Sequence, residues 1–373
     1  MTRQVLLDGP MVFFSTLTLY LLVLFMRARR TMVFLAAAGA MGLTMLAKES
    51  SVVLLGSVYA FLALTPQVRR PWRLGLSGLA VVVLVFSAHP VSQRLAGAAE
   101  TGRGYLTYQL LRRPNHEWPF YFQVAAPAIG LLVIAASALA VLTARRAWTW
   151  RETLLTCWIL VPVAFFQLWT VKGFQYLLPV APAVALLAAR GLTGPWPTLR
   201  VPAAWRPGVR LVAGAVVVLS VAVPSWRGVN PSAATTFLAG TGGVPGGREV
   251  GTWLAENTPA GSVMLTVGPS MSNIIKYYSH RGSFGLSVSP NPLHRNPAYE
   301  PVVNPDRALR DNEMNYIVWD AYSANRSPFF SDSLLELARR YNGRVVYTYS
   351  VTRDDRGDEP VDVPVIVVYE VRP

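Results

Sequence analysis

Lysine is rare in this sequence, and two of its three lysines border apolar segments. The 373 residues include 31 Arg but only Lys48, Lys172 and Lys276. Arg takes the other basic positions between apolar segments. The presence of lysine at positions 48 and 172 therefore favours a specific function for these two side chains. A compact ammonium ion suits a phosphate or pyrophosphate oxygen at a membrane surface. The alternative is snorkelling, in which the stem covers apolar surface and the charge stays in water. Both interpretations stay open.

Asp8 is the first acidic residue and stands two residues before the first apolar segment. Its carboxylate could bind an acceptor hydroxyl or a metal ion, or support a base in proton transfer. The alternative is a solvated carboxylate in a loop. Asp8 by itself does not decide between these roles.

The segment 89–119 combines basic, acidic and aromatic side chains ahead of an apolar run. Arg112 and Arg113 could clamp a phosphate, and His116 with Glu117 could serve in proton transfer. Trp118 could stack on a sugar ring, although aromatics at the entrance of a span commonly form an interface belt. The chain has neither H-E-x-x-H nor G-x-S-x-G, so a zinc hydrolase and a nucleophile-elbow hydrolase are not indicated.

The composition is that of a membrane protein with a soluble portion. Hydrophobic residues make up 52% and charged residues only 14%, against about 25% charged in a typical soluble domain. The single Cys157 excludes an internal disulfide and a cysteine-based metal site. We predict a polytopic α-helical membrane protein of about eight spans. The eight uncharged apolar runs are 10–26, 31–47, 50–66, 74–88, 120–144, 153–171, 173–189 and 209–226.

Arginine clusters at every second connection predict the orientation of these spans. They are Arg27/Arg29/Arg30, Arg69/Arg70/Arg73, Arg145/Arg146/Arg151 and Arg190/Arg200/Arg206/Arg210. By the positive-inside rule these connections are cytoplasmic. Residues 1–9, Lys48-Glu49, 89–119 and Lys172 then face outward, as does everything after Trp226. The excess positive charge belongs to the connections of the membrane half rather than to a soluble face, so nucleic acid is not an expected partner.

The remaining third of the chain reads as a separate unit. We predict a membrane domain over 1–226, a Gly/Pro-rich linker over 227–247 and an extracytoplasmic α/β domain over 248–373. Helices are expected at 249–257, 270–280 and 331–341, with a long loop at 287–312. Strands are expected at 262–267, 315–320, 344–351 and 363–371.

Three segments of the membrane half together resemble the GT-C glycosyltransferases that use polyprenyl-phosphate-linked sugars. This superfamily includes the protein O-mannosyltransferases and the bacterial aminoarabinose transferases acting on lipid A. Leu7-Asp8-Gly9-Pro10-Met11 is similar to the family's acidic segment before a span. Gly42 to Ser50, centred on Ala47-Lys48-Glu49, is similar to its span–Lys–span hairpin. Lys172-Gly173-Phe174-Gln175-Tyr176, followed by Pro179, is similar to its Lys-x-x-x-Tyr entry into a late span.

The resemblance implies an inverting transfer of one sugar from a lipid phosphate carrier to an acceptor outside the cytoplasm. Lys48 and Lys172 would bind the donor phosphate, and Asp8 matches the family's second acidic site. We also place Glu49 and Tyr176 among the substrate-binding residues. We expect a polyprenyl-phosphate sugar donor, membrane lipid and an extracytoplasmic acceptor as partners. No cofactor is certain and no metal ligand is assigned, but a divalent cation is compatible with this chemistry.

One departure from the family pattern keeps a second interpretation open. The family's main catalytic carboxylate lies in the first outer loop, and no such loop precedes Asp8. We therefore expect a chain that lacks an N-terminal part, or a member that has lost catalysis. The alternatives to a transferase are a non-catalytic accessory protein and a flippase of surface glycan assembly.

Overall fold

The computed structural model describes residues 8–68, 71–97, 108, 109, 111, 114, 116–144, 148–194, 205–229, 244–353 and 361–372. The chain divides into two compact units, one built from the apolar helices and one that contains the C-terminal sheet. Each unit is described by itself.

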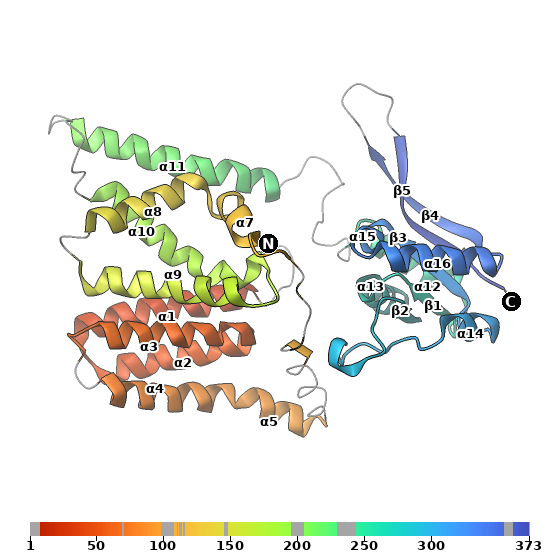
Figure 1. Cartoon of the computed structure of the whole chain (residues 1–373), viewed down its shortest axis with the longest axis horizontal. Coiled ribbons are helices and arrows are strands. Elements are labelled where there is room, and N and C mark those ends of the chain that lie inside the picture. Colours follow the sequence, from red (N-terminus) through yellow and green to blue (C-terminus); the bar gives the residue numbers. More distant parts are fainter. Residues whose placement is uncertain are drawn as a thin grey trace. The chain divides into compact units, whose positions relative to one another are not determined.

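The helical unit consists mainly of apolar helices (Figure 1). Its first half contains α1 (Asp8–Ala28), α2 (Thr31–Ala47), η1 (Glu49–Val52), α3 (Val53–Leu64), α4 (Pro71–Phe86) and α5 (Ala88–Leu95). Its second half contains α7 (Phe120–Ile129), α8 (Leu131–Ala144), α9 (Trp150–Leu168), η2 (Phe174–Val180), α10 (Ala181–Thr193) and α11 (Arg206–Val229).

The chain is a multi-pass membrane protein, but a count of eight spans is not confirmed. In the described part, five helices are long and apolar enough to cross a bilayer, or six if the pair α7 and α8 forms one span. The apolar helices at 31–47 and 49–64 are shorter, because Lys48 and Glu49 interrupt what would otherwise be one long apolar run. A span needs about 20 residues at 1.5 Å each.

The run 120–144 does not form the single tilted span that its length predicts. It breaks between α7 and α8 with a bend of 100°. Pro127 lies inside α7, and Gly130 follows it with φ +95°. Proline removes a helical N–H donor, and only glycine adopts such a φ without strain. The Pro127 and Gly130 pair is therefore the sequence signal of this break.

Small residues and one tryptophan set the packing between the helices. Trp158 on α9 is fully buried and donates its indole N–H to the carbonyl of Pro179 at 3.0 Å. Gly191 on α10 faces α8 so closely that an added Cβ would lie 2.0 Å from the carbonyl oxygen of Ala136. The α8–α10 contact therefore requires glycine at position 191.

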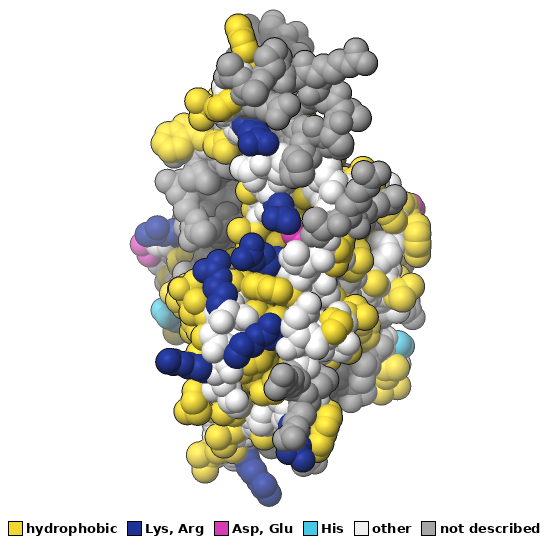
Figure 2. All heavy atoms as spheres, turned by 90° about the vertical axis from the view of Figure 1, so that its left-hand side faces the viewer, with side chains coloured by type: hydrophobic (Ala, Val, Ile, Leu, Met, Phe, Trp, Pro, Cys, Tyr) yellow, Lys and Arg dark blue, Asp and Glu magenta, His cyan; other side chains and the backbone are white. Residues whose placement is uncertain are grey.

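One end of the helical unit is rich in arginine. Figure 1 places the ends of α1, α3, α8 and α10 and the starts of α2, α4, α9 and α11 at this end. Figure 2 looks onto it and shows Lys and Arg side chains with very few acidic ones. The described arginines of the four predicted cytoplasmic connections therefore gather at one end, as their alternation predicts. Which side of the membrane this end faces stays a prediction.

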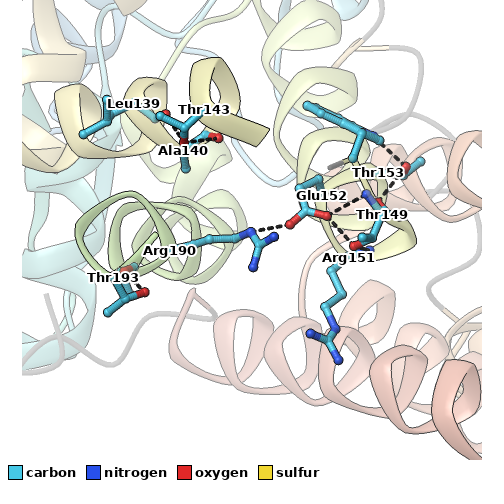
Figure 3. A network of polar contacts seen from close by, with 11 residues as sticks. Leu139, Ala140, Thr143, Thr149, Arg151, Glu152, Thr153, Arg190 and Thr193 are labelled. Carbon is cyan, nitrogen blue, oxygen red and sulfur yellow. Dashed lines mark hydrogen bonds and ion pairs between the residues drawn. The ribbon is translucent and has the colours of Figure 1, made fainter. Parts of the chain in front are cut away.

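Glu152 is the buried acid at this basic end (Figure 3). It forms a capping box at the start of α9, where its Oε2 accepts the backbone N–H of Thr149 at 2.9 Å. Its Oε1 forms an ion pair with Nε of Arg190 on α10. A buried carboxylate needs such a partner to offset its lost hydration. The pair fixes the start of α9 against the end of α10.

The C-terminal unit is a five-stranded mixed sheet with helices. The strand order is β2-β1-β3-β5-β4, in which β2, β1 and β3 are parallel and β5 and β4 are antiparallel additions. The strands are β1 (Val263–Thr266), β2 (Gly282–Gly285), β3 (Tyr316–Asp320), β4 (Arg344–Arg353) and β5 (Val361–Glu370). The helices are α12 (Gly247–Asn257), α13 (Pro269–Ser279), η4 (Pro292–His294), α14 (Pro305–Arg310), α15 (Ala321–Arg326) and α16 (Pro328–Arg340).

The α/β pattern predicted for this unit is confirmed for the elements that it named. Each of the four predicted strands and three predicted helices is present within a few residues of its expected bounds. The long loop predicted over 287–312 is wrong in part, because η4 and α14 lie within it. Strand β2 was not predicted. Its sequence, Gly-Ser-Phe-Gly, has weak β-propensity and forms a strand only by pairing with β1.

Asp320 is a buried acid where β3 ends and α15 begins. Its Oδ1 accepts the backbone N–H of Ser323 at 2.7 Å and so caps α15. Its Oδ2 has no hydrogen-bond partner among the described residues. Burial raises the pKa of Asp320 above the ordinary range, against the lowering effect of its hydrogen bonds to Ser323.

We predict that Asp320→Asn stabilises the C-terminal unit at neutral pH. A carboxyl whose pKa is raised by folding contributes stability below its unfolded pKa, about 3.9, and this contribution is lost as the pH rises. Asn keeps the cap without the charge. Thermal unfolding of the full chain in detergent, from pH 4.5 to 7.5, should therefore show a gain for the variant that grows with pH.

Asp306 provides a control, because the pH dependence of its contribution to stability has the opposite sign. Its hydrogen bond with Arg340 lowers its pKa, so its contribution is present at neutral pH and is lost as the pH falls. Asp306→Asn should reduce stability at pH 7.5. A loss of stability for Asp320→Asn at every pH would contradict the prediction.

Candidate active site around Asp8 and Lys48

Asp8 and Lys48 meet at the start of α1 and the end of α2. Nζ of Lys48 lies 2.5 Å from Oδ1 of Asp8, a contact between residues 40 positions apart. The Asp8 side chain is 11% exposed and that of Lys48 is 20% exposed. Asp8 lies in the first turn of α1, where the helix dipole favours a negative charge. The structure thus joins two residues that the sequence suggested separately.

A rigid turn holds Lys48 at this position. Lys48 has an extended backbone between α2 and η1, and its N–H donates to the carbonyl of Thr44 at 3.1 Å. The hydroxyl of Ser51 donates to the carbonyls of Lys48 and, at 3.1 Å, of Thr44. These bonds satisfy carbonyls that the end of α2 would otherwise leave without partners. The ammonium group is therefore presented from a fixed backbone.

An aromatic cluster lies beside the ion pair. Nζ of Lys48 is 5.5 Å from the ring centre of Tyr176, within the range of a cation–π contact. The ring of Tyr176 stacks on Phe166 of α9 with centres 5.0 Å apart. Tyr176 and Phe166 pack with Tyr121 of α7 and with Trp169, which follows α9. We call Tyr121, Phe166, Trp169 and Tyr176 the aromatic cluster.

Lys172 is buried at the edge of this cluster. It is 6% exposed, and its Nζ donates to the backbone carbonyl of Trp169 at 3.1 Å. Burial of the ammonium group argues against simple snorkelling, which keeps the charge in water. Lys48 and Lys172 therefore contact the same aromatic cluster, through Tyr176 and Trp169 respectively.

Tyr121 fixes the backbone between Lys172 and Tyr176. Its hydroxyl group lies 3.2 Å from both the N–H and the carbonyl oxygen of Gly173, accepting from the first and donating to the second. This clamp joins α7 to the segment that carries Lys172 and Tyr176. Sequence reasoning missed the positions of Tyr121 and Phe166, because nothing in their spacing separates them from ordinary interface aromatics.

The other predicted site residues are not joined to the ion pair by contacts in the described part. His116 is exposed and stacks on Phe120, with ring centres 4.1 Å apart. Glu117 and Glu49 are exposed. Trp118 is 61% exposed, and its carbonyl accepts the side-chain N–H of Gln167 at 2.8 Å. Arg112 and Arg113 lie outside the described residues.

No group of three or more His, Cys, Asp or Glu side chains that could hold a metal ion occurs within the residues that the structure describes. The positive charges at the candidate site are the two lysine ammonium groups. A requirement for a divalent cation stays a prediction.

Comparison with known proteins now gives the fold a name. A family model described as dolichyl-phosphate-mannose-protein mannosyltransferase matches residues 1–92. The solved structure of ArnT from Cupriavidus metallidurans bound to undecaprenyl phosphate is 18% identical, with a TM-score of 0.58 over 97% of this chain and 74% of that chain. Its apo structure is 17% identical with the same TM-score and coverage. The chain shares the fold of ArnT. No curated protein sequence matches.

The resemblance of the sequence to GT-C transferases is thereby confirmed. The region matched by the family model contains Asp8 and Lys48 but not Lys172. The structural likeness to ArnT, by contrast, spans both units of the chain. At this identity the likeness establishes the fold alone, while the roles of individual residues rest on the geometry described above.

We predict that Tyr121→Phe loosens the backbone around Gly173. Each lost hydrogen bond contributes roughly 0.5–1.5 kcal/mol, so the two together should accelerate local hydrogen exchange by about tenfold or more. Exchange measured by mass spectrometry on peptides covering 172–176 provides the test. Tyr59→Phe is the control, because it removes one hydrogen bond, to Gly75 at 3.2 Å, in a different helix pair. Unchanged exchange at 172–176 in Tyr121→Phe would show that the clamp has no effect.

Proposed function

We propose that this protein is a glycosyltransferase that moves a sugar from a polyprenyl-phosphate carrier to an acceptor outside the cytoplasm. The observation that carries the proposal is the Asp8–Lys48 pair beside the aromatic cluster. It combines a carboxylate, an ammonium group and stacked aromatic faces at one place. The GT-C fold and the family match that includes Asp8 and Lys48 support this assignment.

The lysines serve the leaving group. In this transfer the bond from the sugar's anomeric carbon to the phosphate oxygen breaks, and the lipid phosphate leaves with the bonding electrons. No acid has to protonate a phosphate leaving group, but its charge must be stabilised. Lys48 and Lys172 supply two positive charges in a partly buried setting, where their effect exceeds that in water. Arg112 and Arg113, which belong to the segment 89–119, would extend phosphate binding.

Asp8 serves the acceptor. A new bond forms from the acceptor oxygen to the anomeric carbon, on the face opposite the leaving phosphate, and the acceptor proton passes to the carboxylate. Asp8 is paired with Lys48 at 2.5 Å. A donor phosphate that binds Lys48 takes over this ion pair and frees Asp8 to accept a proton. His116 and Glu117 are the alternative proton acceptors from the sequence.

Aromatic side chains bind the sugar ring or the isoprenoid chain. Tyr176 presents one face to Lys48 and stacks on Phe166, so its role is to hold the phosphate-binding lysine. Trp118 is exposed at the start of α7, which suits stacking on an acceptor or donor sugar. Glu49 adjoins Lys48 and would bind a substrate hydroxyl. The acceptor is a protein, a lipid or a glycan on the outer face.

We predict that Lys48→Ala and Lys172→Ala each weaken donor binding. A hydrogen bond to a charged group contributes roughly 1.5–3 kcal/mol, which corresponds to about a 10- to 150-fold rise in Kd. Titration of purified protein in detergent with undecaprenyl phosphate measures this. Lys276→Ala is the matched control. It removes the third lysine of the chain, which lies on α13 of the C-terminal unit beside Phe284 and is not a residue of the candidate site. If both site variants bind as tightly as the control, the lysines have no role in phosphate binding.

We predict that Asp8→Asn lowers turnover far more than donor affinity. General-base catalysis contributes about 10²–10⁴-fold, so kcat should fall by that factor, while Lys48 remains available for the phosphate. Product formation from polyprenyl-phosphate sugar, together with donor titration, separates the two effects. Tight donor binding without any turnover in wild-type protein would instead favour the accessory or flippase function.

A further inference from the structure

A groove at the basic end of the helical unit is lined by residues of the α1–α2 turn, of the α3–α4 connection and of the start of α4. Figure 1 places these segments at the same end of the unit. Its volume is about 710 Å³. Its lining combines two arginines, three neutral polar side chains and three apolar ones. The lining residues are Phe25, Arg29, Thr31, Gln67, Val68, Arg73, Leu74 and Ser77. The proposed transfer site uses none of these residues.

Arg29 reaches across the groove from a constrained backbone. Its φ of 55° is left-handed, and its N–H donates to the carbonyl of Phe25 at 2.7 Å, which ends α1. Its Nη1 donates to the carbonyl of Gln67 at 3.1 Å. In the described part of the chain, the hydrogen bonds of its guanidinium all come from Nη1. The guanidinium group of Arg29 is thus oriented through Nη1, and its Nε and Nη2 are available to an anion.

Arg73 supplies the second charge from the first turns of α4. Its guanidinium carbon lies 5.0 Å from the ring centre of Trp72, which is 60% exposed. An exposed Trp next to Arg at the end of a span is typical of the depth of lipid headgroups. No acidic residue lines the groove, and the sequence has no Asp or Glu between Glu49 and Glu100. A bound anion therefore meets no nearby carboxylate from this part of the chain.

An apolar stripe continues from the groove along α4. Leu76, Leu79 and Val83 are 60%, 38% and 57% exposed, and their spacing places them on one face of the helix. A free phosphate ion has no use for such a surface, whereas a phospholipid places its acyl chains against it. Basic pockets between membrane helices are a recognised form of site for anionic headgroups.

We propose that this groove binds the phosphate of an anionic phospholipid, with Arg29 and Arg73 on the headgroup and the Leu76–Val83 stripe against an acyl chain. The site is separate from the proposed donor site, because it lies between α1, α2 and α4 at the opposite end from Lys48. Its ligand is a structural or regulatory lipid of the surrounding bilayer, not a substrate of the transfer.

Native mass spectrometry of the purified full chain, titrated with phosphatidylglycerol or phosphatidylcholine, tests the proposal. We expect a first phosphatidylglycerol to bind more tightly than phosphatidylcholine. A basic side chain near an anionic lipid contributes enough for about a fivefold change in affinity, so Arg29→Gln with Arg73→Gln should weaken phosphatidylglycerol about 30-fold. Arg73→Gln alone, which leaves the Arg29 bonds to the fold intact, should weaken it about fivefold.

The control removes the same charge elsewhere. Arg151→Gln with Arg210→Gln changes two other arginines of the predicted cytoplasmic connections and should leave phosphatidylglycerol binding nearly unchanged. Equal losses in control and groove variants would mean general attraction to a basic surface and would overturn the site. Displacement of the lipid by millimolar inorganic phosphate, or no preference over phosphatidylcholine, would also overturn it. Lys48→Ala should not affect this binding.

Discussion

The arrangement of the helical unit depends on the cost of burying charge in an apolar environment. Two acidic side chains are buried among its described residues, Asp8 and Glu152, and each is paired with a base from a neighbouring helix. A buried carboxylate without a partner would be several kcal/mol less favourable. The pairs therefore fix where α1 meets the end of α2 and where α9 meets α10. The remaining described charges of the unit lie at helix ends or in connections.

The two pairs differ in how completely their carboxylates are engaged. Glu152 accepts the backbone N–H of Thr149 through Oε2 and forms an ion pair with Arg190 through Oε1, so both of its oxygens are engaged by the protein (Figure 3). Asp8 is held by Lys48 through one oxygen, and its side chain is 11% exposed, against 1% for Glu152. A structural pair excludes a competing ligand, whereas a partly open pair admits one. The chemistry proposed at Asp8 follows from this difference.

Three charged residues and Tyr176 of this candidate site could be singled out in the sequence, whereas its other aromatic residues could not. Lys48, Lys172 and Asp8 stood out because each is rare for its position, and rarity is visible in a single sequence. Tyr121 contacts Gly173, 52 residues away in the chain, and Phe166 stacks on Tyr176, 10 residues away. No local sequence pattern encodes such contacts. The same limit explains the missed strand β2, which forms by pairing with β1. The break at Gly130 was missed for a different reason, because hydropathy outweighed the local signal of Pro127 and Gly130.

The choice of Lys at position 48 and Arg at position 190 matches these two roles. A guanidinium forms fixed, planar contacts and stays charged, which suits the permanent bond of Arg190 to a buried acid. An ammonium group is a point charge on a flexible stem and can turn from one oxygen to another with little loss. Lys48 touches a single carboxylate oxygen and the face of Tyr176, and neither contact requires a planar fork. In a chain with 31 Arg and three Lys, a lysine at this pair therefore fits the proposed role of binding a donor phosphate.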